Sequence, residues 1–304
     1  MEDCAEQGIY GVKFFFKGRW TTVIVDDLVP CHQIGDQWLP LFAHWKGTKE
    51  TWAMIAEKAW AKLHGSYEAI DGGRTEDALG YLSGGCTVTT TFRDRDNKQI
   101  LAISNGQLWQ DLSGAYHTNS KESGCFMSAS GVSEASSSAG KKGNENPSMV
   151  GKNSTGLVTG HAYSVLNLQD VENHQLIQLR NPWGSYEWGG DWSDHSPLWT
   201  SSMKEAVGFV DADDGSFWMS FKDFVNEYNQ VGVCKTVPNT WTSEIRHGQW
   251  KAPELAGGNG DTLAHFNPLF ELNNTHPTVW IQAEQVCWLF LLALATLFIS
   301  LFSP

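Results

Sequence analysis

The sequence predicts an α+β fold, and three observations carry that prediction. Two runs rich in β-branched and aromatic residues, "IYGVKFFF" and "WTTVIVDD", flank "KGR" and indicate a hairpin over residues 8–30. The segment 49–64, "KETWAMIAEKAWAKLH", repeats its apolar residues at helical spacing and stops at Gly65, which indicates an amphipathic helix. Three strand-like runs, "HAYSVLNL", "LIQLRNP" and "FWMSF", lie in the second half of the chain.

The other elements follow in order along the chain. "RTEDALGYLSGG" predicts a second, shorter helix, and residues 105–122 are expected to form helix and loop. Residues 128–156 are rich in Ser, Gly and Asn and lack periodicity, so we expect a surface loop there. "KDFVNEY" predicts a short helix. From about Trp241 the composition is typical of the start of a β-sandwich, which places a domain boundary near Pro238.

Composition narrows the function classes. The chain has 304 residues with a net charge of −13, and this charge argues against nucleic acid as a partner because phosphate binding needs clustered Lys and Arg. The same carboxylates are suited to a hard cation such as calcium. Six cysteines without CxxC pairs fit neither a zinc site nor a disulfide framework, so we expect a reduced, cytoplasmic location.

The C-terminal residues 286–304 are the exception to this picture. Residues 286–303, "VCWLFLLALATLFISLFS", carry no charge and are just long enough for a helical membrane span. Two interpretations stay open: a tail anchor that would attach the protein to a membrane, and translated noncoding sequence from an error in the gene model.

His161 and Asn181 are the candidate chemistry. Gly160 precedes the histidine, and Pro182 forces Asn181 into an extended or turn conformation. If the two strands pair as a hairpin, the Asn amide oxygen can accept from the imidazole and fix its tautomer. The other ring nitrogen then pairs with a thiol, as in a Cys-His-Asn triad.

The motifs around this pair resemble the calpain family of cysteine proteases. "GLVTGHAYSVLNL", "LIQLRNPWGSYEWGGDWSD" and "DDGSFWMSFKDF" are similar to the second half of the calpain protease core, and "GIYGVKFFFKGRWTTVIVDDLVP" to a strand pair ahead of it. The resemblance implies a papain-like core over 1–238, and the start of a C2-like β-sandwich over 239–285, truncated after its first strands. It also implies that His161 and Asn181 are catalytic and that Trp183 lies beside the cleft.

The nucleophile that the resemblance requires is missing from this sequence. The family cysteine lies in a "QGxxGDCW" motif, and no such motif occurs here. Cys4 does not match the family cysteine. Only three residues separate it from Gly8, where the resemblance implies a whole helix, and it is followed by Ala rather than Trp. We therefore expect a calcium-dependent cysteine endopeptidase of protein substrates by family, and an inactive chain in isolation. A non-catalytic homologue acting as a regulatory or protein-interaction module is the alternative, and a small-molecule or peptide-binding protein is a third. Whether a regulatory subunit binds stays open.

Calcium ligands also follow from the resemblance. Glu187, Asp194 and Asp214 match carboxylates of a family calcium site, and Ala212 would add a backbone carbonyl. Ser216 stands where the family usually has Glu, so we expect a weakened site because affinity follows ligand charge. A second family site needs Glu50 together with groups from the Cys-bearing first subdomain, and is expected to be incomplete.

Overall fold

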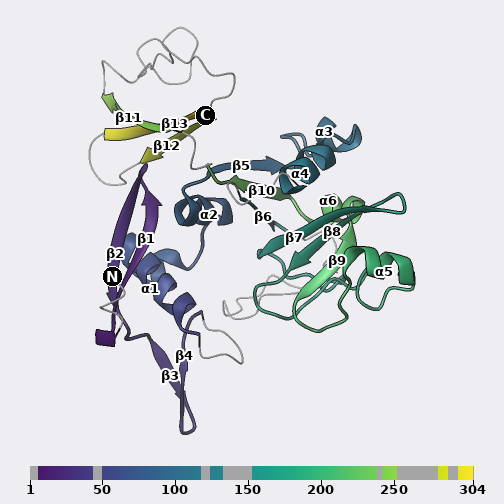
Figure 1. Cartoon of the computed structure of the whole chain (residues 1–304), viewed down its shortest axis with the longest axis horizontal. Helices are drawn as coiled ribbons and strands as arrows, with labels where there is room; N and C mark the ends of the chain where they lie inside the picture. The colour runs from purple at the N-terminus through teal and green to yellow at the C-terminus, as the bar shows by residue number, and fades with distance from the viewer. Residues whose placement is uncertain are drawn as a thin grey trace. The chain divides into compact units, whose positions relative to one another are not determined.

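The computed structural model describes residues 6–43, 50–117, 124–132 and 153–237, together with strands over 242–251, 280–286 and 294–303. The chain divides into two compact units, Met1–Cys86 with Thr240–Pro304, and Thr87–Asn239. In Figure 1 the elements of both units are coloured along the chain, from purple at the N-terminus to yellow at the C-terminus. His161, Asn181 and Trp183 all belong to the second unit.

The first unit begins with the hairpin that the sequence predicts. Strand β1 (Ile9–Phe16) pairs antiparallel with β2 (Arg19–Asp26), and Phe16 lies opposite Arg19. Lys17 and Gly18 form the two-residue turn, both at positive φ (52° and 74°). A turn with two such residues matches the right-handed twist of the strands it joins. A second, short hairpin follows, β3 (Cys31–Ile34) with β4 (Gln37–Pro40).

The predicted amphipathic helix packs against the first hairpin. Helix α1 (Trp52–His64) begins three residues later than the 49–64 segment and ends at Gly65, as expected. Its buried residues Ile55 and Ala59 form a core with Phe14, Val23 and Val25. A short 3₁₀ turn η2 (Glu68–Ile70) and the predicted second helix α2 (Thr75–Ser83) complete this part.

A six-stranded sheet is the centre of the second unit. Its strands are β5 (Cys86–Thr91), β6 (Cys125–Ser130), β7 (Ala162–Val171), β8 (His174–Arg180), β9 (Ser216–Ser220) and β10 (Gln230–Lys235), in the spatial order β5-β10-β6-β7-β8-β9. The three strands predicted in this half are β7, β8 and β9. The loop predicted over 128–156 begins later, because residues 128–130 belong to β6; residues 133–152 lie outside the described part.

Helices cover both faces of this sheet, as alternate residues of β9 show. Phe217 and Met219 join a core that includes residues of α4 (Gln107–His117) and α6 (Phe221–Glu227), the helices predicted from 105–122 and "KDFVNEY". Trp218 points the other way and packs with Met203 of α5 (Ser201–Val207). A four-residue helix, α3 (Leu101–Ser104), precedes α4, and Figure 1 shows α5 and α6 beside β7, β8 and β9.

The C-terminal residues form strands. β11 (Thr242–Lys251), β13 (Leu294–Ser303) and β12 (Trp280–Val286) make an antiparallel sheet in that spatial order. Residues 294–303, part of the possible membrane span, form the central strand of this sheet, and residues 287–293 lie outside the described part. In the part of the chain that the structure describes, no helix has the length and apolar character to cross a membrane. A complete or truncated sandwich stays a prediction.

Candidate active site

The β7–β8 hairpin brings His161 and Asn181 together. Ser164 lies opposite Arg180 in the register, so the residue before β7 and the residue after β8 meet at one end of the hairpin. Gly160, at φ 65°, turns the chain into His161. Nε2 of the His161 ring lies 2.9 Å from Oδ1 of Asn181. The juxtaposition that the sequence predicted is thus present.

The Asn181 side chain is fixed from several directions. Its Oδ1 also accepts from the backbone N–H of Trp183 at 3.0 Å, and its Nδ2 donates to the carbonyl of Tyr186 at 3.4 Å. The Asn181 backbone N–H donates to the carbonyl of Gly215 at 2.8 Å, and the residue is fully buried. Because Oδ1 can only accept, Nε2 of His161 is the protonated nitrogen and Nδ1 keeps a lone pair.

The surroundings of His161 favour a neutral ring. Trp183 packs on the imidazole with ring centroids 4.2 Å apart and is itself 42% exposed. Tyr163 meets the same ring edge-on at 5.3 Å. Burial lowers the pKa of His161 below its ordinary value, and the hydrogen bond to Asn181 partly opposes that shift. At neutral pH the ring therefore has Nδ1 available as a base.

The predicted calcium ligands lie on two neighbouring loops. Oε1 of Glu187 accepts from the backbone N–H groups of Asp214 (3.1 Å) and Gly215 (2.7 Å). The Ala212 backbone partly offsets the rise in the pKa of the Asp194 carboxylate. The backbone N–H of Ser216 donates to Oδ1 of Asp214 at 2.8 Å. The loops 187–194 and 211–216 are therefore joined at these carboxylates.

The electrostatics of these loops suit a cation. Burial first, and then the charges of Asp194 and Asp213, raise the pKa of Glu187. Burial likewise raises the pKa of Asp194, with Asp211 and Asp214 adding to the effect. Oδ1 of Asp194 is buried without a hydrogen-bond partner, so one anionic oxygen is unsatisfied. The donor chemistry fits calcium, although among the described residues no three such side chains are gathered closely enough to form a ready ligand set.

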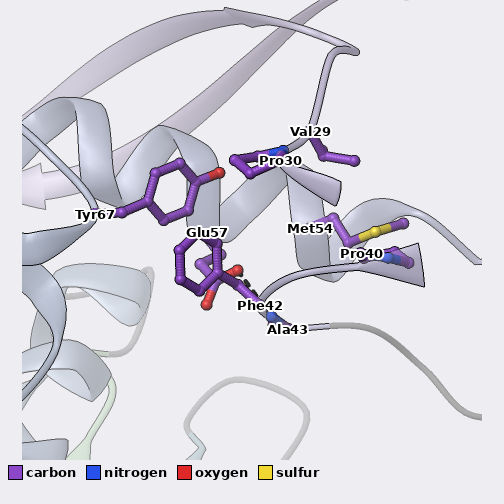
Figure 2. Close-up of a pocket in the computed structure, with 8 residues that line it drawn as sticks. All are labelled: Val29, Pro30, Pro40, Phe42, Ala43, Met54, Glu57 and Tyr67. Atoms are coloured by element: carbon purple, nitrogen blue, oxygen red, sulfur yellow. Dashed lines mark hydrogen bonds between the residues drawn. The ribbon is translucent and has the colours of Figure 1, made fainter. Parts of the chain in front are cut away.

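The first unit holds the other predicted ligand and a surface hollow. Glu50 is exposed and lies two residues before the first residue of α1. Figure 2 shows the hollow, where Phe42 and Tyr67 stack at 4.5 Å and the Glu57 carboxylate accepts from Ala43 N–H at 3.0 Å. Burial raises the pKa of Glu57. The sequence reasoning missed this hollow, since its lining comes from four separate segments without a shared motif.

The cysteines of the second unit are poor nucleophiles. Burial raises the pKa of Cys125 to about 11, so its thiol is protonated at neutral pH. The β6–β7 register places Ser130, at the far end of β6, opposite Ala162, so Cys125 lies about 17 Å along the strand from the His161 end. Cys234 is fully buried. Cys4 and Cys287 lie outside the described residues.

A His ring held neutral by burial and oriented by a buried Asn is the arrangement that serves as the base in thiol proteases. The comparison with known families agrees: residues 1–235 match the model of the calpain family of cysteine proteases. "Calpain-type cysteine protease DEK1" of Arabidopsis thaliana is 37% identical over 272 residues, which cover 89% of this chain and 12% of that protein. Calpain-8 of Mus musculus is 34% identical over 282 residues, 88% of this chain and 36% of that protein. The chain belongs to the calpain family.

Proposed function

We propose that this chain is part of a calpain-type cysteine endopeptidase that cleaves protein substrates. It carries the catalytic base, His161, and the residue that orients the base, Asn181. Nδ1 of His161 takes the proton of a cysteine thiol, and the thiolate attacks the carbonyl carbon of a peptide bond. His161 then gives the proton to the leaving amine nitrogen as the C–N bond breaks. A water molecule loses a proton to His161, attacks the thioester and releases the acid, and the thiol regains the proton. The observation that supports this role is the 2.9 Å His161–Asn181 contact.

Asn181 and Trp183 have supporting roles in this proposal. Asn181 keeps Nε2 protonated and therefore keeps Nδ1 as the acceptor, and its own amide is locked by Trp183 N–H and the Tyr186 carbonyl. Trp183 covers one face of the imidazole while exposing part of its own surface. In this position it excludes water from the ring and forms a wall against which an extended substrate can lie.

The nucleophile, we infer, comes from a segment with the family's "QGxxGDCW" motif, which these 304 residues do not include. The glutamine of that motif would also provide an oxyanion-hole donor, and loss of one such donor typically costs about 10²–10³ in rate. The chain as given is therefore expected to be inactive by itself.

Calcium is part of the proposal at the loops 187–194 and 211–216. Glu187, Asp194 and Asp214 would hold it, with the Ala212 carbonyl. The bound ion would supply positive charge against the carboxylates whose pKa values are raised and against the unsatisfied Asp194 oxygen. Ser216 removes one charged ligand relative to the family pattern, so we expect weak affinity.

The test is reconstitution. The chain is expressed alone and fused after a calpain segment that carries "QGxxGDCW", and casein cleavage is measured with and without calcium. We expect cleavage by the fusion only, and its loss when His161 is replaced by Ala. Cleavage by the isolated chain that a thiol-directed epoxide blocks contradicts the proposal that the nucleophile lies elsewhere. A folded fusion that never cleaves favours the alternative, a non-catalytic homologue with an interaction role.

A further inference from the structure

Residues 153–157 form a compact turn organised by a buried asparagine, which we call the Asn153 turn. Oδ1 of Asn153 accepts from Thr155 N–H (3.1 Å), Thr155 Oγ1 (2.7 Å) and Leu157 N–H (2.9 Å). Its backbone N–H donates to the Leu157 carbonyl at 2.8 Å. The residue is only 3% exposed. A buried amide that collects this many bonds from one turn defines the turn's geometry.

The Asn153 turn is anchored to a helix and to the loop 187–194, which we call the acidic loop. Nδ2 of Asn153 donates to Oε2 of Glu227, the last residue of α6, at 3.2 Å. The Thr155 carbonyl accepts from Gly189 N–H at 2.9 Å. Gly156 adopts φ 94°, and a Cβ there would lie 2.3 Å from the Glu187 carbonyl oxygen. The turn therefore has one packing position against the segment that carries Glu187.

The far side of the turn leads directly to His161. Leu157 and Val158 are buried in the core of the second unit. The Val158 N–H donates to the Tyr163 hydroxyl at 2.7 Å, and the Tyr163 ring meets the His161 ring edge-on. Residues 158–163 are thus closed into a loop with His161 at its outer end. Because this loop follows the Asn153 turn directly, a shift of the turn would move the His161 ring.

We propose that Asn153 is a positioning residue for His161, which it serves by locking residues 153–158 between Glu227 and the acidic loop. This inference rests on the proposed function of His161 as the base. Asn153-Ser154-Thr155 is also an N-glycosylation pattern. Here Nδ2, the atom that would carry a glycan, is buried and bonded to Glu227, so the pattern serves the turn.

The test reads the His161 ring in the full chain and needs no protease activity, so it can fail independently of the proposed function. Histidines are labelled with ¹⁵N, the His161 signals are assigned by their loss in His161→Gln, and the ring is titrated by NMR. In Asn153→Ala the loop loosens and water reaches the imidazole. We expect its pKa to rise toward the ordinary value of about 6.5, and its Nε2–H signal to exchange faster with water.

Three further variants make the result specific. Thr200→Ala removes the N-cap of α5, beyond the opposite end of β7, and should lower Tm without moving the His161 titration. Asn153→Asp with Glu227→Gln exchanges donor and acceptor between the two side chains and should restore the native titration. Thr155→Val, a milder change, replaces Asn153→Ala if that variant does not fold. An unchanged His161 titration in the folded turn variants, or an equal shift in Thr200→Ala, overturns the proposal.

Discussion

At the residue scale, Gly215 connects the two parts of the candidate site. Its carbonyl accepts from the backbone N–H of Asn181, and its own N–H donates to the Glu187 carboxylate. It adopts φ 86°, and a Cβ there would lie 2.7 Å from the Asn181 carbonyl oxygen and 2.8 Å from Gly184 Cα. A shift of the acidic loop is therefore transmitted to Asn181 through one residue.

Gly215→Ala should accordingly be much more destabilising than an alanine at another left-handed glycine. Gly160, at φ 65°, has no atom within 4 Å of its would-be Cβ, so Gly160→Ala pays only the backbone cost of about 1–2 kcal/mol. At Gly215 the clash with backbone atoms is added, and we expect a total loss above about 3 kcal/mol. Urea unfolding of both variants measures this, and equal losses would show that the contact can relax.

The lowered pKa of His161 gives a pH dependence of stability. The unfolded chain takes up the proton at about pH 6.5, whereas the folded chain does so only at lower pH because the ring is buried. The stabilisation is present above the unfolded pKa and is lost as pH falls through the folded one. The unfolding free energy of the wild type should fall more between pH 7.5 and 5.5 than that of His161→Gln. Parallel curves for the two proteins would contradict this.

At the element scale, short helices such as α6 depend on their caps. The Ser220 hydroxyl accepts from Asp223 N–H at 3.0 Å and donates to the Asp223 carboxylate at 2.6 Å. Ser220→Ala should cost about 1 kcal/mol of unfolding free energy. Ser201→Ala, an exposed first-turn serine of α5, should change it by less than about 0.5 kcal/mol. Denaturant midpoints of the two variants test the difference, and a Ser220 loss no larger than that of Ser201 counts against the cap.

Strongly patterned elements could be predicted from the sequence, and context-dependent ones could not. The β1–β2 hairpin, α1 and the strands around His161 have clear periodicity or turn signals, and the structure contains them. Strand β6 reads "CFMSAS", whose small polar residues resemble a loop; pairing with β7 and β10 makes it a strand. Residues 294–303 carry no charge and are mostly apolar, which fits a membrane helix as well as a central strand, so composition alone could not decide.

The residues of the candidate site also differ in whether the sequence could predict them. His161 and Asn181 could be placed together because hairpin pairing follows from local sequence. The contributions of Asn153, Glu227 and Gly215 could not be predicted, because they arise from contacts between segments far apart in the chain, such as Asn153 with Glu227. The Asn-x-Thr-Gly pattern was a usable signal for an Asn-centred turn, since Asn side chains often bond to backbone N–H groups two residues on.

At the scale of the whole molecule, the acidic balance of the chain bears on its proposed metal. The net charge of −13 disfavours folding through self-repulsion, and a bound cation offsets part of it. Ser216→Glu adds a carboxylate at the start of β9, beside Asp214, which its backbone N–H contacts. We expect calcium binding measured by calorimetry to tighten by about tenfold, or about 1.4 kcal/mol, and to disappear in Glu187→Gln. Calcium binding that is indifferent to both changes would place the ion elsewhere.

The β7–β8 hairpin also has a kinetic consequence. His161 and Asn181 are 20 residues apart, whereas Ser130 and Gln230, which pair β6 with β10, are separated by 100. Short loops close at lower entropic cost, and hairpins form in about 1–10 μs. We expect β7 and β8 amides to gain protection from pulse-labelled hydrogen exchange during refolding before those of β10. The base and its orienting partner would then meet early in folding, while the sheet that surrounds them is still incomplete.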